Sequence, residues 1–180
     1  MTDALKHRGP DGVGYYVNDV GGRQLDRHEV SARQYISLGV RRLAIIDLKT
    51  GDQPIFNEDK SVVIIFNGEI YNYKTLRAEC EKRGHRFYTN TDTEVIVHLY
   101  EDYGEKCLEN LCGMFAFALW DERGSVVGSR SDNGTGKLLL ARDRLGIKPL
   151  FYAKTSDGNI VFASEINSIL LHPKVSKEIN

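Results

Sequence analysis

The stretch SVVIIFNGEIYNY, from Ser61 to Tyr73, decides how the rest of the chain is arranged. Residues Val62 to Phe66 are β-branched or aromatic and are apolar at odd and even positions alike, which predicts a strand covered on both faces. Asn67-Gly68 after such a run is also a strong hairpin signal. No second alternating strand follows, because Tyr73 to Arg83 is rich in helix formers. A hairpin and a strand–turn–helix site therefore both stay open.

Asn67 and Gly68 have the chemistry of an anion site. Asn67 carries a side-chain amide donor, and Gly68 has a backbone N–H with no Cβ beside it. Two donors that converge on one point suit an oxyanion. Glu69, the next residue, can accept a hydrogen bond from a cationic group, although a glutamate at a strand end is more often simply solvated.

The composition excludes several classes of partner. A chain of 180 residues can bury about 70% of the surface that its unfolded form exposes. Its 24 Lys and Arg residues nearly balance 25 Asp and Glu residues, so no overall field attracts nucleic acid or an anionic membrane. The apolar runs are too short to span a bilayer, and Met1 to Pro10 has no apolar signal-peptide core. We expect a soluble, cytoplasmic protein.

The three cysteines, Cys80, Cys107 and Cys112, predict neither a disulfide framework nor a zinc site. Their number is odd, and the chain has no CxxC motif or paired Cys/His spacing. We expect reduced core thiols and no metal. His7 lies in the turn-rich segment Lys6 to Gly14, and a lone histidine near a terminus is more often structural than an acid or base.

Two arginines interrupt the strand-like run ISLGVRRLAIIDL, from Ile36 to Leu48. Alternation along a strand places Arg41 and Arg42 on opposite faces, and both faces are otherwise largely apolar. One arginine is therefore expected to point inward or into a cleft, where its guanidinium suits a carboxylate. The alternative is a pair with Asp47 or a solvated charge at the strand end.

Turn and helix signals divide the remaining chain into short elements. A helix is expected from Tyr73 to Gly84, and a capping box, Thr91 to Glu94, opens another in which Asp92 opposes the helix dipole. Further strands are expected over Gly113–Trp120, Lys137–Ala141 and a hairpin of Leu150–Ala153 with Ile160–Ala163. Short turns between strands that are apolar on both faces predict an α+β domain with largely antiparallel sheets and more than two layers.

A series of longer motifs runs along nearly the whole chain. They are HRGPDG (His7–Gly12), RRLAIIDL (Arg41–Leu48), NGEIYNY (Asn67–Tyr73), TDTEV (Thr91–Val95), GMFAFALWD (Gly113–Asp121), ARDRLGIKPL (Ala141–Leu150) and FASE (Phe162–Glu165). With these motifs, the chain resembles the class II glutamine amidotransferase domain of glutamine-hydrolysing asparagine synthetases. The resemblance implies the four-layer αββα sandwich of N-terminal nucleophile hydrolases, which agrees with the layer argument.

The resemblance also implies a glutamine site with a role for each matched residue. Asn67 and Gly68 would form the oxyanion hole over the side-chain amide carbon. Arg42 would hold the α-carboxylate, and Asp92 would take the α-ammonium group. Backbone groups of two isoleucines and one further carboxylate complete the implied binding set, which is Arg42, Ile45, Ile46, Asn67, Gly68, Glu69 and Asp92.

The family's nucleophile is a cysteine exposed after Met removal in a Met-Cys-Gly-Ile start, which this chain does not have. We therefore expect residues 1–180 to form one amidotransferase domain that lacks the family's N-terminal cysteine segment, its first strand and the C-terminal synthetase domain. We also expect no appreciable glutaminase activity. The alternatives are a short protein that binds glutamine or a partner without hydrolysis, and a hydrolase that uses Thr2.

The same resemblance sets the expected cofactors and partners. No cofactor is expected for this domain, because ATP and Mg²⁺ belong to the synthetase domain. The expected partners are glutamine and the synthetase domain of the parent enzyme, with a homodimer as one possible assembly. Nucleic acid and membranes are not expected partners.

Overall fold

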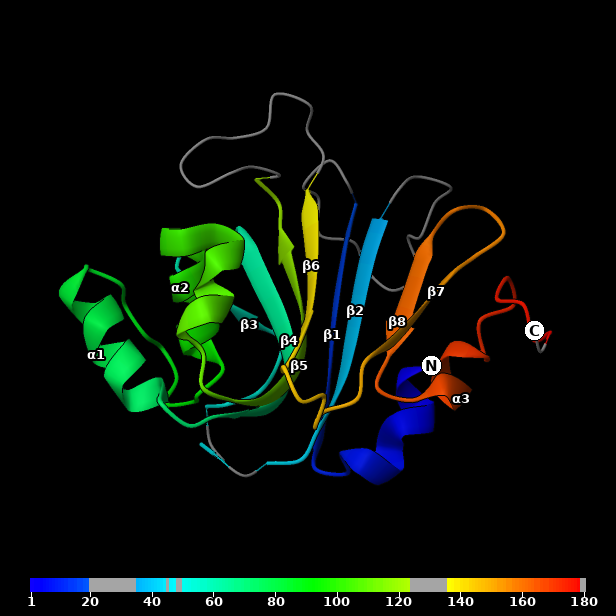
Figure 1. Cartoon of the computed structure of the whole chain (residues 1–180), viewed down its shortest axis with the longest axis horizontal. Helices are drawn as coiled ribbons and strands as arrows, with labels where there is room; N and C mark the ends of the chain where they lie inside the picture. The colour runs from blue at the N-terminus through cyan, green and yellow to red at the C-terminus, as the bar shows by residue number, and fades with distance from the viewer. Residues whose placement is uncertain (20–34, 45, 48–49, 124–135, 179–180) are drawn as a thin grey trace.

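The structure, a computed structural model, describes residues 1–19, 35–44, 46–47, 50–123 and 136–178. Its elements are η1 (Thr2–Arg8), β1 (Gly12–Asp19), β2 (Tyr35–Arg42), β3 (Ile55–Phe56), β4 (Val62–Ile70), α1 (Tyr73–Lys82), α2 (Glu94–Tyr103), η2 (Gly104–Asn110), β5 (Gly113–Asp121), β6 (Lys137–Arg142), β7 (Phe151–Lys154), β8 (Ile160–Ala163) and α3 (Ile166–Ile169). They stack in layers that Figure 1 shows nearly edge-on.

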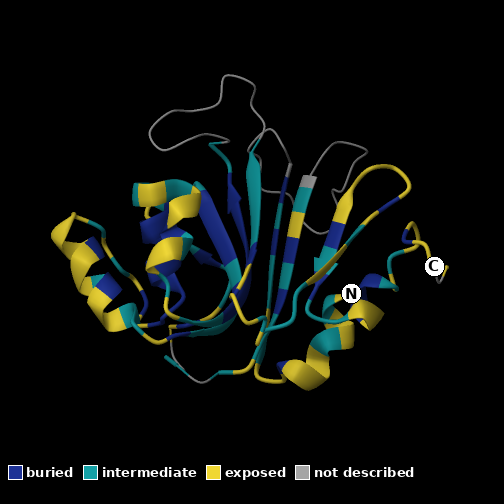
Figure 2. Ribbon diagram, in the orientation of Figure 1, coloured by how far each residue is buried: buried dark blue, intermediate teal, exposed yellow. Residues whose placement is uncertain are grey.

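The central sheet has the strand order β3-β4-β5-β6, and every neighbouring pair is antiparallel. Strands β4 and β5 lie in its middle and pair along their whole length, with Val62 opposite Asp121 and Ile70 opposite Gly113. Figure 2 shows both strands as largely buried. The prediction that the two most apolar segments form central strands is confirmed.

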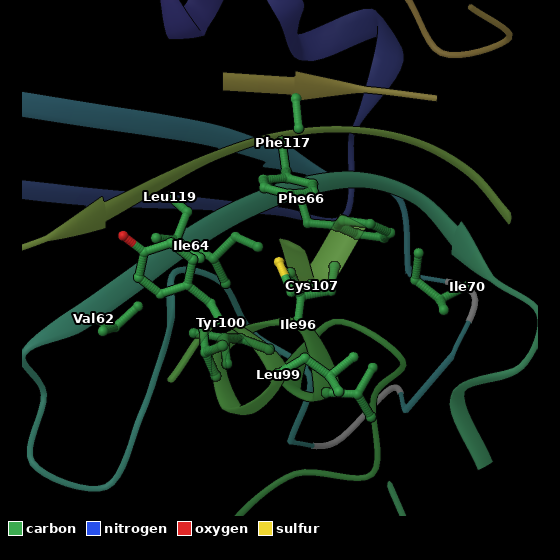
Figure 3. Close-up of a cluster of buried hydrophobic side chains, with 14 of the residues drawn as sticks. Val62, Ile64, Phe66, Ile70, Ile96, Leu99, Tyr100, Cys107, Phe117 and Leu119 are labelled. Atoms are coloured by element: carbon green, nitrogen blue, oxygen red, sulfur yellow. The ribbon is translucent and has the colours of Figure 1, made fainter. Parts of the chain in front are cut away.

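One face of this sheet packs against α2, and α1 packs in turn against α2 (Figure 1). Ile64, Phe66 and Ile70 of β4 are buried there against Ile96 and other residues of α2 (Figure 3). These β4 residues occupy even positions, as a period of two requires for side chains on one face of a strand. Leu76 and Cys80 of α1, which lie four residues apart, are buried in the same cluster.

The other face of the central sheet packs against a second β layer, which consists of two antiparallel pairs, β1–β2 and β7–β8. Tyr16 and Leu38 from β1 and β2 are buried together with Val63, Ala118 and Trp120 from the central sheet. A third apolar cluster lies between β8 and α3, and η1 lies beside α3 (Figure 1). The predicted αββα sandwich is confirmed.

Three predicted boundaries are wrong. Strand β4 does not stop at Phe66 but continues to Ile70, so the Asn-Gly pair forms neither a hairpin nor a turn. Strand β2 ends at Arg42 rather than Leu48. The Lys6 to Gly14 segment contains the end of η1 and the start of β1. At the end of β4 and at the start of β1, pairing with another strand overrides the local turn signal.

The capping box at the start of α2 is half formed. The N–H of Glu94 donates to Thr91 Oγ1 at 3.4 Å, as predicted. The Glu94 carboxylate does not return to Thr91, because it accepts from the backbone N–H groups of Tyr88 and Thr89 at 2.8 and 2.7 Å. In the described part of the chain, no helix is both long enough and apolar enough to cross a membrane.

Candidate functional site

A cavity of about 1180 Å³ opens between the two β layers beside the C-terminal end of β4. All the predicted site residues that the structure describes line it, although they come from three separate segments of the chain. They are Arg42, Ile46, Asn67, Gly68, Glu69 and Asp92. Ile45, the remaining predicted residue, lies outside the described residues.

The alternation of β4 aims two polar side chains at this cavity. Ile65, Asn67 and Glu69 occupy odd positions and line the cavity, whereas Ile64 and Ile70 pack toward α2. The continuation of the strand past Phe66 therefore keeps Asn67 and Glu69 on the same face. Within the described residues, the Asn67 amide has no hydrogen-bond partner, so its N–H groups are available to a ligand.

Gly68 is required by the neighbouring strand. A Cβ at this position would collide with the carbonyl oxygen of Met114 and would lie 2.7 Å from the Cα of Phe115. The sequence suggested that glycine leaves room for a ligand, whereas the close contact is with the backbone of β5. Any larger residue here would push β4 away from β5 at the cavity edge.

Gln53 positions the backbone immediately before Asn67, and the sequence did not reveal this role. Its side-chain Nε2 donates to the Phe66 carbonyl at 3.0 Å, and its Oε1 accepts from the Phe66 N–H at 2.7 Å. The side chain thus acts as a short strand that extends the pairing of β3 with β4 beyond Ile55. This role depends on the register of the two strands, which no local pattern encodes.

Arg42 lies at another wall of the cavity with its side chain only 10% exposed. Its guanidinium donates to Asp52 Oδ1 at 2.8 Å and to the carbonyls of Ile46 and Asp47 at 3.3 and 2.5 Å. The Asp52 side chain is 87% exposed, so this carboxylate is mostly surrounded by solvent and can be exchanged for another at little cost. The arrangement suits recognition of a carboxylate.

Asp47 ties the loop below Arg42 to the segment before α2. Its carboxylate accepts from the backbone N–H groups of Thr50 and Asn90 at 2.9 and 2.8 Å. Its own backbone has φ +52°, an uncommon conformation for a residue with a side chain. A Cβ on Gly51 would lie 2.5 Å from Arg42 Nη2 and 2.6 Å from Thr91 Cγ2. Only glycine therefore fits between the Arg42 guanidinium and the segment that precedes α2.

Asp92 joins the start of α2 to the end of β4. Its Oδ2 accepts from the Ile70 N–H at 2.8 Å, and the residue is buried at the cavity wall. Burial raises the pKa of Asp92, and the charge of Glu69 adds to this effect, while the Ile70 N–H opposes it. Two carboxylates at one end of a cavity favour a cationic group between them.

None of the three cysteines lines the cavity. Cys80 and Cys107 are buried, and burial raises the pKa of their thiols to about 11 and about 12. Cys112 is exposed, so the prediction that it is a core thiol is wrong. Thr2 does line the cavity, from η1 rather than from a strand.

His7 has the structural role that the sequence favoured. Its Nε2 lies 2.9 Å from Glu165 Oε1, and Arg8 donates to the same oxygen at 3.3 Å. These bonds tie η1 to the residue that precedes α3. Hydrogen bonds from His7, and more weakly from Arg8, lower the pKa of Glu165. His7 itself does not line the cavity.

Comparison with known proteins gives one family for the whole chain. The model of the glutamine amidotransferase domain family matches residues 1–180. The chain is 41% identical over 180 residues to asparagine synthetase [glutamine-hydrolyzing] 2 of Bacillus subtilis and 41% identical over 169 residues to asparagine synthetase [glutamine-hydrolyzing] 2 of rice, Oryza sativa subsp. japonica. These alignments cover 100% and 94% of this chain, but only 20% and 24% of the relatives.

A solved structure agrees with this grouping. Glutamine phosphoribosylpyrophosphate amidotransferase from B. subtilis superposes with a TM-score of 0.67 at 25% identity, over 93% of this chain and 38% of that one. The similarity therefore covers both the sequence and the layered fold. The chain belongs to the glutamine amidotransferase domain family.

Proposed function

We propose that this chain is the glutamine-binding domain of a glutamine-dependent asparagine synthetase. One observation carries the proposal: Arg42, the Asn67-Gly68-Glu69 segment and Asp92, which are well separated in sequence, line a single cavity. The names of its relatives, glutamine-hydrolysing asparagine synthetases, support glutamine as the substrate. They also support aspartate as the acceptor of the nitrogen and a synthetase domain as the partner.

In the proposed complex, the α-carboxylate, the α-ammonium group and the side-chain amide of glutamine each contact a different part of the cavity wall. The guanidinium of Arg42 exchanges Asp52 for the substrate's α-carboxylate, beside the backbone of Ile45 and Ile46. Asp92 accepts from the α-ammonium group, whose charge offsets the cost of this buried carboxylate. Glu69 and two donors complete the proposed contacts, the donors being the Asn67 amide and the Gly68 N–H.

The proposed reaction is hydrolysis through an acyl intermediate. A thiolate adds to the side-chain amide carbon, and the carbonyl oxygen becomes an oxyanion between Asn67 and Gly68. The C–N bond then breaks, the nitrogen takes a proton and ammonia leaves. Water cleaves the thioester, which releases glutamate and regenerates the thiol. Loss of one oxyanion donor in such a site lowers the rate by about 100-fold to 1000-fold.

The location of the cysteines favours a second candidate for the 180-residue polypeptide, which is glutamine binding without hydrolysis. Cys80, Cys107 and Cys112 all lie away from the cavity, and the first two have raised pKa values. We infer that the 180-residue polypeptide supplies the substrate contacts and the oxyanion donors but no attacking thiolate. The remaining alternative is a hydrolase that uses the Thr2 hydroxyl as its nucleophile. Substitution of Thr2 tests that alternative directly.

Calorimetric titration of the purified polypeptide with glutamine tests the proposed function. We expect saturable binding that Arg42→Gln weakens by about tenfold or more, because a hydrogen bond to a charged group is lost. Arg144→Gln, at an exposed arginine outside the cavity, is the matched control. Absence of glutamine binding, or equal binding by both variants, would contradict the proposal.

A coupled assay of glutamate release separates the two candidates. We expect no release above background from the 180-residue polypeptide. Turnover that disappears in Thr2→Ala would establish Thr2 as the nucleophile. Turnover that survives in Thr2→Ala but disappears after thiol alkylation would show that one of the three cysteines reacts, and either result would overturn the binding-only candidate.

A further inference from the structure

A cluster of two histidines and two glutamates lies outside the candidate site. Glu58 belongs to the turn between β3 and β4, His85 to the segment after α1, and His98 and Glu101 to α2 (Figure 1 shows these elements). One nitrogen or oxygen atom of each residue lies within 4.8 Å of the others. None of the four lines the cavity. Three segments distant in sequence thus bring four metal-ligating groups together.

The four His–Glu distances within this His₂Glu₂ cluster are close to those between ligands of a tetrahedral ion. His98 Nδ1 lies 3.2 Å from Glu101 Oε2 and 3.4 Å from Glu58 Oε2. His85 Nδ1 lies 3.4 Å from Glu58 Oε1 and 3.7 Å from Glu101 Oε2. Ligand atoms at 2.0–2.1 Å from a tetrahedral Zn²⁺ are about 3.3–3.4 Å apart. The four candidate ligand atoms lie within 4.8 Å of one another, so the cluster must contract to surround one ion, and Glu58 must present a single oxygen to both histidines.

A further carboxylate lies near the second ring nitrogen of each histidine. His85 Nε2 lies 3.2 Å from Asp102 Oδ1, whereas the buried His98 Nε2 lies 3.6 Å from Glu94 Oε1, just beyond hydrogen-bond distance. A histidine that binds a metal almost always directs its second ring nitrogen at a carboxylate, a carbonyl or water. With the proton on Nε2, each Nδ1 would present a lone pair to the glutamates, and either a metal ion between them or a proton on Nδ1 would remove that repulsion.

The glutamates are held in place without using all their oxygens. Glu101 Oε1 accepts from Asn57 Nδ2 at 2.7 Å, which leaves Oε2 toward the histidines. Glu58 Oε1 accepts from the Arg86 N–H at 2.9 Å. The His98 side chain is 1% exposed, whereas that of Glu58 is 37% exposed. The site is thus mostly enclosed but can be reached from solvent along the Glu58 side.

We propose that Glu58, His85, His98 and Glu101 bind one divalent transition-metal ion of the Zn²⁺ class. Imidazole nitrogens and carboxylate oxygens are ligands that suit Zn²⁺. Four protein ligands would leave no open coordination position, which is typical of a structural site rather than a catalytic one. The ion would fasten the β3–β4 turn and the segment after α1 to α2.

The alternative occupant of the same space is a proton. Burial lowers the pKa of His98, but the carboxylates of Glu101, Glu94 and Glu58 outweigh burial and raise it to about 9. A protonated His98 paired with these groups would make a hydrogen-bonded network without metal. Direct titration with metal distinguishes the two occupants.

Titration of EDTA-treated, full-length chain with Zn²⁺ and with Co²⁺ tests the proposal. We expect one equivalent of either ion to bind, and Co²⁺ to show the intense visible absorption of a tetrahedral complex. Zn²⁺ at a hundredfold excess over its Kd should raise the melting temperature by about 5 °C or more. Glu58→Gln and His85→Gln should each weaken binding more than about tenfold, whereas His7→Gln, at an exposed histidine outside the cluster, should not.

Three results would overturn the proposal. They are failure of the folded wild-type chain to bind stoichiometric Zn²⁺, equal binding by Glu58→Gln and the wild type, and a Co²⁺ spectrum without tetrahedral bands. Glu58 is partly exposed and lies in a turn, so its variant is expected to fold. A far-UV circular dichroism spectrum of the metal-free variant checks this, and glutamine binding by the same sample shows that the cavity is intact.

Discussion

At the scale of single residues, Asp92 has two roles. It fixes the start of α2 to β4 through the Ile70 N–H, and it lines the cavity as a buried carboxylate beside Glu69. Because its pKa is raised in the folded chain, protonated Asp92 favours folding, and this contribution is lost as the pH rises through the raised value. At neutral pH, the free protein therefore holds an unfavourable charge that a bound ammonium group would relieve.

Substitution of Asp92 separates stability from binding. Asp92→Asn keeps an oxygen for the Ile70 N–H and removes the buried charge, so the melting temperature at pH 7 should stay equal or rise. Glutamine affinity should fall about tenfold to a hundredfold, because a hydrogen bond to a charged group is worth about 1.5–3 kcal/mol. Scanning calorimetry and glutamine titration measure the two effects.

The pH dependence provides the matching control. In the wild type, affinity should decrease as the pH falls from 7 toward the raised pKa of Asp92, since the protonated acid no longer attracts the ammonium group. In Asp92→Asn, this dependence should be flatter. Wild-type affinity in the variant, or identical pH profiles, would refute the assignment of Asp92.

At the scale of elements, the end of β4 carries the candidate oxyanion donors on a paired strand. Asn67 and Gly68 lie opposite Ala116 and Phe115 of β5, and Gln53 holds the adjacent Phe66 from the other side. Donors on a strand that is fastened on both edges are held more rigidly than donors on a turn. This rigidity is what stabilisation of a developing charge requires.

Gly68→Ala tests how closely β4 and β5 must approach each other. The added methyl group would meet the backbone of Met114 and Phe115, which cannot move aside as a flexible side chain would, so we expect destabilisation of about 1–3 kcal/mol and weaker glutamine binding. Urea unfolding measures the change. Gly12→Ala is the control, because its Cβ would lie 3.5 Å from the Cβ of Arg42, an ordinary contact. Equal loss of stability in both variants would contradict this account.

At the scale of the whole molecule, the layers differ in burial. Strands β4 and β5 have apolar cover on both faces, one from α2 and the other from β1 and β2. By contrast, three of the four residues of β7 are exposed, and the cluster under α3 is small (Figure 2). Stability should therefore be uneven across the sandwich.

Hydrogen exchange measures this difference. Amides of β4 and β5 should exchange only through global unfolding, whereas those of β7 and β8 should exchange at least about tenfold faster through local opening, although they too are paired in a ladder. Peptides from α2 serve as an internal reference, because that helix is buried on the central sheet. Equal protection of the β7–β8 pair and the central strands would contradict the expected order.

By itself, the sequence predicted which segments are central strands, that the sheets are largely antiparallel and layered, and that Asn67, Gly68 and one of two arginines suit an anion site; Asp92 entered the site only through the family resemblance. Periodicity and residue type predict the strands and layers, because side chains on one face of a strand meet the same environment, either the core or solvent. Only the tertiary structure decided that β4 runs on through Asn67 to Ile70, that Gln53 clamps Phe66, and that two histidines meet two glutamates. Those features depend on strand register and on contacts between distant segments, which local patterns do not encode.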